Sequence, residues 1–354
     1  GFNSDICSRW HLGYADPSVS VVRELQQAGF SRGELEAADL GASRGGGLRD
    51  RFFDRVMFPI HDEQGRCIGF GGRVMGDAKP KYLNTRETSV FHKSKHMFAF
   101  DYAKESIAAR GFAIVTEGYM DVISMHEAGF TNTVAALGTA LSADHIRTLS
   151  RFAKTIVCMF DGDAAGQHAA EAAVRYVEST KASLTCVVLP DNQDPDEFLK
   201  AHGREAMEEQ LRQARPLIEF VVDKKLETLD LSSPGLRIAA LEEIAKVLAP
   251  LKSSYLLDGY AQQVAGRLGI DVEVTKEKIR STPVEGEETG NAPADDYGYE
   301  YAPSGGYGEE YAPVDDYGYD YVPEPEPTVQ SQPSVSLGAL SAEDRTQIRA
   351  ERNL

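Results

Sequence analysis

Short apolar runs alternate with helix-like segments in the middle of the chain. Residues 112–116, 133–137, 155–160 and 184–189 are apolar on successive positions, which is typical of strands buried on both faces. The segments between them, near 119–129, from 142 onward and over 164–179, carry apolar residues at helical spacing. This order of elements predicts an α/β fold in which helices cover both sides of a mostly parallel sheet.

The pattern differs on both sides of this region. Residues 1–43 favour short helices, whereas residues 56–60 and 66–73 have the composition of two strands joined by the turn Asp62-Glu-Gln-Gly65. Residues 204–281 show helical periodicity, with breaks expected at Pro216, Pro234 and Pro250. We therefore expect an N-terminal α/β subdomain over 1–110, the sheet domain over 111–203 and a helical subdomain over 204–282.

The composition changes abruptly after residue 282. Residues 284–327 hold thirteen acidic residues and no Lys or Arg, and a Tyr-Xaa-Pro tripeptide recurs every ten residues from Tyr301. A short, polar repeat broken by proline cannot bury a core, so we expect a disordered acidic Tyr/Pro/Gly linker over 283–338. A helix-like pattern over 339–354 is interpreted as the truncated start of a further, C-terminal domain.

The net charge of −18 is distributed unevenly. Most of it lies in the acidic tail, while residues 44–95 hold eleven Lys and Arg against six Asp and Glu. A globally acidic protein can still present a basic face, so the composition does not exclude nucleic acid as a partner.

The four cysteines are far apart in the sequence and form no zinc-ligand spacing. Reduced thiols would fit a cytoplasmic protein. No signal peptide is recognisable, and no apolar run is long enough to span a membrane. Because the sequence starts at Gly1 within what reads as globular sequence, we expect it to be a piece of a longer protein.

Acidic residues follow three of the predicted strands, as the pairs Glu117 and Asp121, Asp161 and Asp163, and Asp194 and Asp196. The carboxyl ends of parallel strands meet at one edge of the sheet, so these carboxylates are expected to cluster there. Such a cluster needs cations to offset its repulsion, and oxygen ligands favour Mg²⁺ or Mn²⁺ over zinc. The pattern predicts metal-assisted chemistry on phosphates.

A second interpretation remains open for part of this set. An Asp directly after a strand is often only a helix N-cap. For Asp194 and Asp196, a capped turn and direct contact with metal are both compatible with the sequence.

The Glu-Gly of residues 117–118 and the Asp-Gly-Asp of residues 161–163 resemble the Toprim pattern found in topoisomerases, primases, recombination proteins and some nucleases. Further segments narrow the resemblance to the catalytic core of bacterial DNA primase, over about residues 1–270. These segments are 51–60, 69–73, 80–84, 91–93, 117–122, 136–139, 161–166 and 189–196.

The resemblance implies a three-part RNA polymerase domain with a central Toprim domain. It implies synthesis of RNA primers on a single-stranded DNA template from ribonucleoside triphosphates, during DNA replication and with Mg²⁺ or Mn²⁺. Family primases also carry an N-terminal zinc-binding domain, which we expect to be lacking here. The replicative helicase would bind the C-terminal domain that is cut off at 354. We expect a monomeric core in the cytoplasm, at the nucleoid and replisome.

The resemblance also assigns roles to residues. Glu117, Asp161 and Asp163 would be catalytic, and these three with Asp194 and Asp196 would hold the ions of a two-metal site. Glu117 could instead handle the proton of the attacking hydroxyl. The nucleotide and the template would be bound by a further set, namely Arg51, Arg55, Arg73, Lys81, Tyr82, Asn84, Lys93 and Asp121.

Within that set the side chains suggest different contacts. Arg73, Lys81 and Lys93 suit phosphates, and Tyr82 suits a stacked base. Asn84 could hydrogen-bond sugar or phosphate, and Arg51 and Arg55 would line the track of the single strand. Asp121 would support Glu117 or complete an ion site.

Two rival functions remain. The chain could be another Toprim enzyme, a nuclease or a topoisomerase-like protein. A topoisomerase would need a nucleophilic Tyr in a separate folded domain, whereas the tyrosines here are concentrated in the acidic tail. A nuclease would not need residues 51–93. It could also be a non-catalytic fragment that binds single-stranded DNA. Incorporation of ribonucleotides distinguishes a primase from both.

Overall fold

The computed structural model describes residues 2–76, 78–138, 141–160 and 164–284. The acidic linker and the terminal segment predicted over 283–338 and 339–354 lie almost entirely outside these ranges. Within the described residues, no helix is long and apolar enough to cross a membrane.

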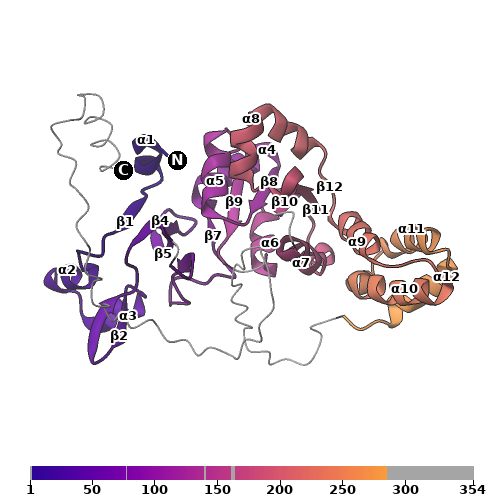
Figure 1. Cartoon of the computed structure of the whole chain (residues 1–354), viewed down its shortest axis with the longest axis horizontal. Helices are drawn as coiled ribbons and strands as arrows, with labels where there is room; N and C mark the ends of the chain where they lie inside the picture. Colours follow the sequence, from indigo (N-terminus) through magenta and orange to yellow (C-terminus); the bar gives the residue numbers. More distant parts are fainter. Residues whose placement is uncertain (1, 77, 139–140, 161–163, 285–354) are drawn as a thin grey trace, which may run out of the picture. The chain divides into compact units, whose positions relative to one another are not determined.

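The N-terminal part is built on a four-stranded antiparallel sheet of order β1-β4-β5-β6. Figure 1 labels β1, β4 and β5 of this sheet. Its strands are β1 (Gly13–Ala15), β4 (Arg55–His61), β5 (Cys67–Val74) and β6 (Tyr82–Asn84). The strand pair predicted from residues 56–60 and 66–73 is therefore confirmed as β4 and β5, which pair antiparallel. The helices α1 (Ser4–Arg9), α2 (Val21–Gln27) and α3 (Arg32–Ala37) and the hairpin of β2 (Gly41–Arg44) and β3 (Gly47–Asp50) complete this part.

The central part is a six-stranded sheet of order β12-β11-β10-β8-β9-β7. The four inner strands are the predicted ones and run parallel, and the edge strands β12 and β7 are antiparallel to their neighbours. The strands are β7 (Met97–Phe98), β8 (Phe112–Thr116), β9 (Thr133–Ala136), β10 (Thr155–Phe160), β11 (Ser183–Val188) and β12 (Arg215–Pro216). The mostly parallel sheet is confirmed.

Alternate side chains of each inner strand face opposite helical layers. Ile156 and Cys158 of β10 pack in a cluster with α4 (Phe100–Arg110), α6 (Ala143–Leu149) and α7 (Ala164–Val174). Val157 and Met159, between them in sequence, pack with α5 (Tyr119–Glu127) and α8 (Pro195–Arg212) on the other face. This two-sided burial explains why the strands are continuously apolar in sequence.

Helices follow the sheet as predicted. They are α9 (Leu217–Thr228), α10 (Pro234–Leu248), α11 (Leu257–Leu268) and α12 (Val272–Ser281), with breaks near the expected prolines. The predicted boundary between residues 203 and 204 falls inside α8, where Gly203 has a φ of 79° and interrupts the helical geometry. Met207, beyond that break, still packs in the cluster of the central sheet. Because β12 also pairs with β11, the sheet and its cover extend to Pro216.

The start of α6 is fixed by a buried histidine. The Nδ1 atom of His145 accepts a hydrogen bond from the Ser142 N–H (3.3 Å), and Nε2 donates to the carbonyl of His96 (3.1 Å). The side chain is fully buried, and burial lowers the pKa of His145 to about 4. The imidazole is therefore neutral at pH 7 and joins α6 to the loop that follows β6.

This histidine predicts a pH dependence of stability. In the unfolded chain a histidine has a pKa of about 6.5, so the unfolded state takes up the proton first as pH falls. The contribution of His145 is complete above about pH 6.5 and is lost as pH falls toward 4, by up to about 1.4 kcal/mol per pH unit. The variant H145Q keeps a capping side chain that does not titrate. Urea unfolding between pH 7 and 5 should show a flatter slope for H145Q, and identical slopes would contradict this role.

Candidate active site

The first acidic pair lies where β8 turns into α5. Glu117 directly follows the strand and is half-buried, while Asp121 lies in the first turn of the helix and is 7% exposed. The Asp121 Oδ2 atom accepts a hydrogen bond from the Gly118 N–H at 3.1 Å. Asp121 therefore closes the turn that follows Glu117, and its role toward Glu117 or an ion stays a prediction.

The third acidic pair lies at the start of α8. Asp194 is the N-cap of this helix, since its Oδ1 accepts from the Glu197 N–H at 2.7 Å, and burial raises the pKa of its carboxyl group. The two oxygens of Asp196 accept from Ser124 Oγ and Lys200 Nζ, each at 2.5 Å. Asp196 thus joins α8 to α5, and the capped turn left open by the sequence is present at Asp194.

Asp161 and Asp163 lie outside the described residues, and they follow β10 directly in sequence. β10 pairs with both β8 and β11, so the three acidic pairs follow three adjacent strands. Among residues 2–76, 78–138, 141–160 and 164–284, no group of three or more His, Cys, Asp or Glu is placed to hold a metal ion. The donors that the described part does offer, Glu117 and Asp194, are carboxylates, and their chemistry fits a hard divalent cation.

The opposite side of the site is formed by β5 and β6. Arg73 and Tyr82 are register partners, and the Arg73 Cζ atom lies 5.9 Å from the centre of the Tyr82 ring. The Arg73 Nε atom is buried and has no hydrogen-bond partner among the described residues. Asn84 lies two residues further along β6, on the same face of the strand.

The two sides meet at Tyr82. Burial raises the pKa of its hydroxyl, the positive charge of Arg73 lowers it, and the negative charges of Asp121 and Asp194 raise it further. The pKa of the Tyr82 hydroxyl is thus affected by charges on both sides of the site. Tyr82 and Asn84 thus lie near the acidic edge of the central sheet, and Arg73 lies beside Tyr82. The contacts of these three residues with a nucleotide stay predictions.

Arg55 has different surroundings from those expected of a residue on a DNA track. It is 7% exposed, and its guanidinium donates to the carbonyls of Pro80 (2.9 Å), Gly72 (3.2 Å) and Lys81 (3.3 Å). These bonds hold the segment before β6 against β4 and β5. The expectation that Arg55 lines the template is corrected on this ground, since a phosphate would have to displace these internal bonds.

Arg51 belongs to a cluster around the buried carboxylate of Asp39. The Arg51 Nε donates to Asp39 Oδ2 at 3.3 Å, and Arg86 donates to the same carboxylate through its backbone N–H (2.8 Å) and its Nε (2.9 Å). The Asp39 side chain is 3% exposed, whereas that of Arg86 is 59% exposed. One carboxylate therefore holds two guanidinium groups at the border of the basic segment.

The replacement of Asp39 by Asn tests this cluster. Asp39 has a φ of 54°, a conformation that Asn tolerates, so the backbone should not change. Loss of the charge weakens the bonds from both arginines, and we expect a loss of about 1–2 kcal/mol in the free energy of unfolding. Urea denaturation of D39N beside D5N, a change at an exposed Asp, measures this difference. Equal stability of the two variants would contradict it.

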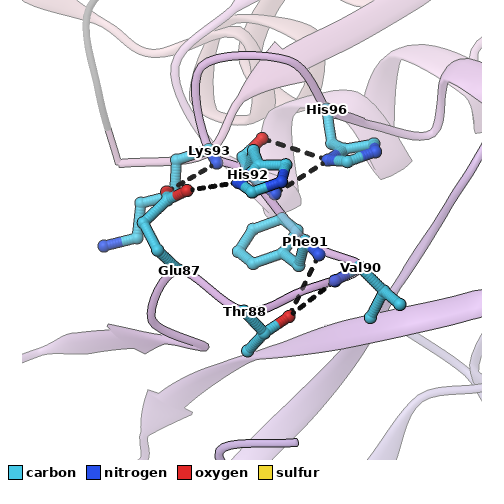
Figure 2. A network of polar contacts seen from close by, with 7 residues as sticks. All are labelled: Glu87, Thr88, Val90, Phe91, His92, Lys93 and His96. Carbon is cyan, nitrogen blue, oxygen red and sulfur yellow. Dashed lines mark hydrogen bonds and ion pairs between the residues drawn. The ribbon is translucent and has the colours of Figure 1, made fainter. Parts of the chain in front are cut away.

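The loop from Glu87 to His96 is held by its own polar contacts (Figure 2). The Glu87 carboxylate accepts from the Lys93 N–H and contacts the His92 Nδ1 atom, each at 2.9 Å. The His92 N–H donates to His96 Nδ1 at 3.0 Å, and Phe91 is fully buried beneath the loop. The backbone of Lys93 is thus fixed, whereas Lys81 is exposed at the start of β6. Phosphate contacts by these two lysines stay predictions.

Several residues that shape the site were not among the predicted site residues. The main ones are Asp39, Arg86, Glu87, Tyr119 and His145. Tyr119 gave a signal that could have been used, because it lies between Glu117 and Asp121. The other four make contacts that sequence periodicity does not reveal. Asp39, Arg86 and His145 bond to residues distant in sequence, and Glu87 lies in a loop without helical or strand periodicity.

Three family models match successive parts of the chain. They are the N-terminal domain of the DNA primase catalytic core over 1–104, a Toprim-like domain over 114–199, and the DnaB-helicase binding domain of primase over 218–273. A crystal structure of a DNA primase domain from Pseudomonas aeruginosa aligns with a TM-score of 0.70 and 34% identity, covering 80% of this chain and 90% of that one. The chain belongs to the family of bacterial DnaG-type DNA primase catalytic cores.

Other relatives agree with this membership. The RNA polymerase domain of the Mycobacterium tuberculosis primase DnaG aligns with a TM-score of 0.68 at 34% identity, over 75% of this chain and 88% of that one. The DNA primase of Escherichia coli K12 is 37% identical over 285 residues, which is 76% of this chain and 47% of that protein. The chain thus spans about half the length of the curated relatives it matches.

One finding shifts an expectation about partners. From the sequence, the helicase contact was expected after the acidic linker, in the domain that begins near residue 339. The model described as helicase-binding instead matches residues 218–273, which form α9, α10, α11 and the start of α12.

Proposed function

We propose that this chain is the RNA polymerase core of a DNA primase and joins ribonucleoside triphosphates on a single-stranded DNA template. The observation that carries the proposal is the meeting of the acidic edge at Glu117 with the strand that bears Tyr82 and Asn84. One side offers carboxylates for cations, and the other offers a cation, an aromatic ring and an amide for a nucleotide. The relatives named above support this assignment. So does a further solved structure to which the chain is similar, a DnaG primase catalytic domain bound to single-stranded DNA, at 36% identity and a TM-score of 0.66.

The proposed reaction is a nucleotidyl transfer. The 3′-hydroxyl oxygen of a nucleotide or primer forms a bond to the α-phosphorus of the incoming nucleotide, the bond from that phosphorus to the pyrophosphate oxygen breaks, and the hydroxyl proton passes to Glu117 or to solvent water. Glu117 accepts this proton or helps to hold a cation, and both roles need its carboxylate. Arg73 offsets phosphate charge, Tyr82 stacks on a base, and Asn84 donates to sugar or phosphate.

Glu117, Asp161, Asp163 and Asp194 would hold Mg²⁺ or Mn²⁺, which would supply positive charge at the phosphates. We assign Asp196 a supporting role, because both of its oxygens already bind Ser124 and Lys200. Lys81 and Lys93 would contact phosphates at the border of the site. Arg51 donates to Asp39 through its Nε atom, so it would contact the template through the other nitrogen atoms of its guanidinium group.

The helical part suggests a protein partner. We propose that residues 218–273 contact a replicative helicase, on the strength of the family model that matches them. Exposed apolar residues in and beside this segment include Leu236, Ile238 and Tyr255, the last of which is 89% exposed.

Extension of a preformed RNA primer on single-stranded DNA tests the proposed reaction. Labelled ribonucleotides are supplied with Mg²⁺ or with Mn²⁺, and the DNA strand carries a second label. We expect the primer to lengthen and the DNA to remain whole. Cleavage of the DNA would favour a Toprim nuclease, and DNA binding without extension would favour a binding fragment.

A further inference from the structure

We propose that Tyr119 is a positioning residue that holds the amide of Asn84 as a hydrogen-bond donor for the incoming nucleotide. The role of Asn84 toward a nucleotide rests on the proposed function. The role of Tyr119 toward Asn84 rests on contacts between described residues of two different subdomains. Tyr119 is the first residue of α5, two positions after Glu117, whereas Asn84 lies on β6.

The contact between Tyr119 and Asn84 is possible because the residue opposite Asn84, Gly71, has no side chain. Gly71 of β5 is the register partner of Asn84 on β6. A Cβ atom at Gly71 would lie 2.4 Å from both Cζ and the hydroxyl oxygen of Tyr119, so the tyrosine fills the space that a side chain would take. The Tyr119 hydroxyl donates to Asn84 Oδ1 at 2.8 Å. A side chain of the central domain is thereby built into the N-terminal sheet.

The Tyr119 ring has little freedom to move. It is 5% exposed and stacks on Phe58 of β4 at 4.9 Å between ring centres. Phe98 of β7 meets it edge-on at 4.8 Å, and Tyr82 lies parallel to it at 6.2 Å. Burial raises the pKa of the Tyr119 hydroxyl, which therefore keeps its proton and remains a donor at neutral pH.

The bond from Tyr119 orients the amide of Asn84. With Oδ1 accepting from Tyr119, the amide presents Nδ2 on its other side, next to Gly138. A Cβ at Gly138 would lie 2.8 Å from Nδ2, and the φ of 69° there also favours glycine. Gly138 directly follows Leu137, just after β9, so Nδ2 lies at the carboxyl end of the central sheet. The bond from Tyr119 thus sets which side of the amide carries Nδ2, and that side lies beside Gly138.

Two consequences follow for nucleotide binding. An amide that is already held in one orientation can donate to a phosphate or sugar oxygen, and binding then does not include the entropic cost of ordering that side chain. Loss of the Tyr119 hydroxyl frees the amide to rotate, which weakens binding of the nucleotide and leaves the carboxylates unchanged. The effect therefore falls on the Kd and KM for the nucleotide and not on kcat.

A double-mutant cycle tests the proposal with ATP and Mn²⁺ as the probe. The variants are Y119F, N84A and the double variant. Y102F is the matched control, because among the described residues its hydroxyl makes a single long bond, of 3.4 Å, to the carbonyl of Arg9. The Kd for ATP is measured by equilibrium dialysis, and KM and kcat by primer extension. Thermal melting checks that each variant is folded.

We expect Kd and KM to rise about fivefold in Y119F and in N84A, with kcat within about twofold of wild type. The double variant should be no weaker than N84A alone, since both changes remove the same interaction. Wild-type values for Y119F, independent effects that multiply in the double variant, or absence of ATP binding by the wild type would each overturn the proposal.

Two further outcomes remain interpretable. If the wild type binds ATP with the expected coupling but extends no primer, the proposed polymerase function fails and the role of Tyr119 stands. If Y119F does not fold, N84D replaces it as the probe. Its carboxylate still accepts from Tyr119 but offers oxygen where Nδ2 stood, so ATP should bind at least about tenfold more weakly, and unchanged binding would overturn the proposal.

Discussion

The variant E117Q is expected to lose ribonucleotide incorporation by about a thousandfold or more. Glutamine keeps the size of the side chain at the end of β8 but removes the negative charge and the proton-accepting oxygen. Both roles proposed for Glu117, as cation ligand and as proton carrier, need the carboxylate. The measurement is the initial rate of primer extension with saturating nucleotide and Mn²⁺.

The control for this variant is E105Q, which changes an exposed glutamate of α4. E105Q should extend primers at the wild-type rate, and E117Q should melt at the wild-type temperature and bind single-stranded DNA as well as wild type does. An E117Q rate within about tenfold of wild type would remove Glu117 from the chemical step.

The variant G71A is expected to lose both stability and activity. The added Cβ would lie 2.4 Å from the buried Tyr119 ring, a distance that forces the ring or the strand to move. Overpacking of this kind costs about 1–3 kcal/mol, and the same movement would separate Asn84 from its partner on α5. The free energy of unfolding in urea and the KM for ATP measure the two effects.

The matched control is G33A. Gly33 lies in α3 with nothing within 4 Å of an added Cβ and with an ordinary backbone conformation. Alanine there should leave activity unchanged and stability equal or higher. A G71A protein as stable and as active as G33A would show that Tyr119 does not occupy the space opposite Asn84.

The central sheet was predictable because its burial follows from local sequence. β10 reads as a strand since residues 155–160 are apolar on successive positions, and the structure buries them against helices on both faces. The edge strand β12 was not predicted, because two residues, one of them Pro216, carry no periodicity. Its pairing with β11 depends on the path of α8, which no local pattern specifies.

The site was predictable in its residue types but not in its contacts. Arg73, Tyr82 and Asn84 were named as nucleotide contacts from the resemblance, and that role stays a prediction. Arg55 looked the same as Arg73 in sequence, yet it is buried against three carbonyls. The two arginines differ in their tertiary contacts, which the sequence does not reveal. Likewise, the bond from Arg86 to Asp39 joins residues 47 positions apart, which periodicity cannot reveal.

Primer synthesis without a preformed primer tests the central claim most directly. The wild-type chain is incubated at high concentration with single-stranded DNA, labelled ribonucleoside triphosphates and Mn²⁺ or Mg²⁺, with E117Q in parallel. The account predicts short RNA products from the wild type that depend on the divalent cation and are absent with E117Q. Failure of the wild type to make or extend RNA while it still binds single-stranded DNA, or products of equal yield from E117Q, would contradict it.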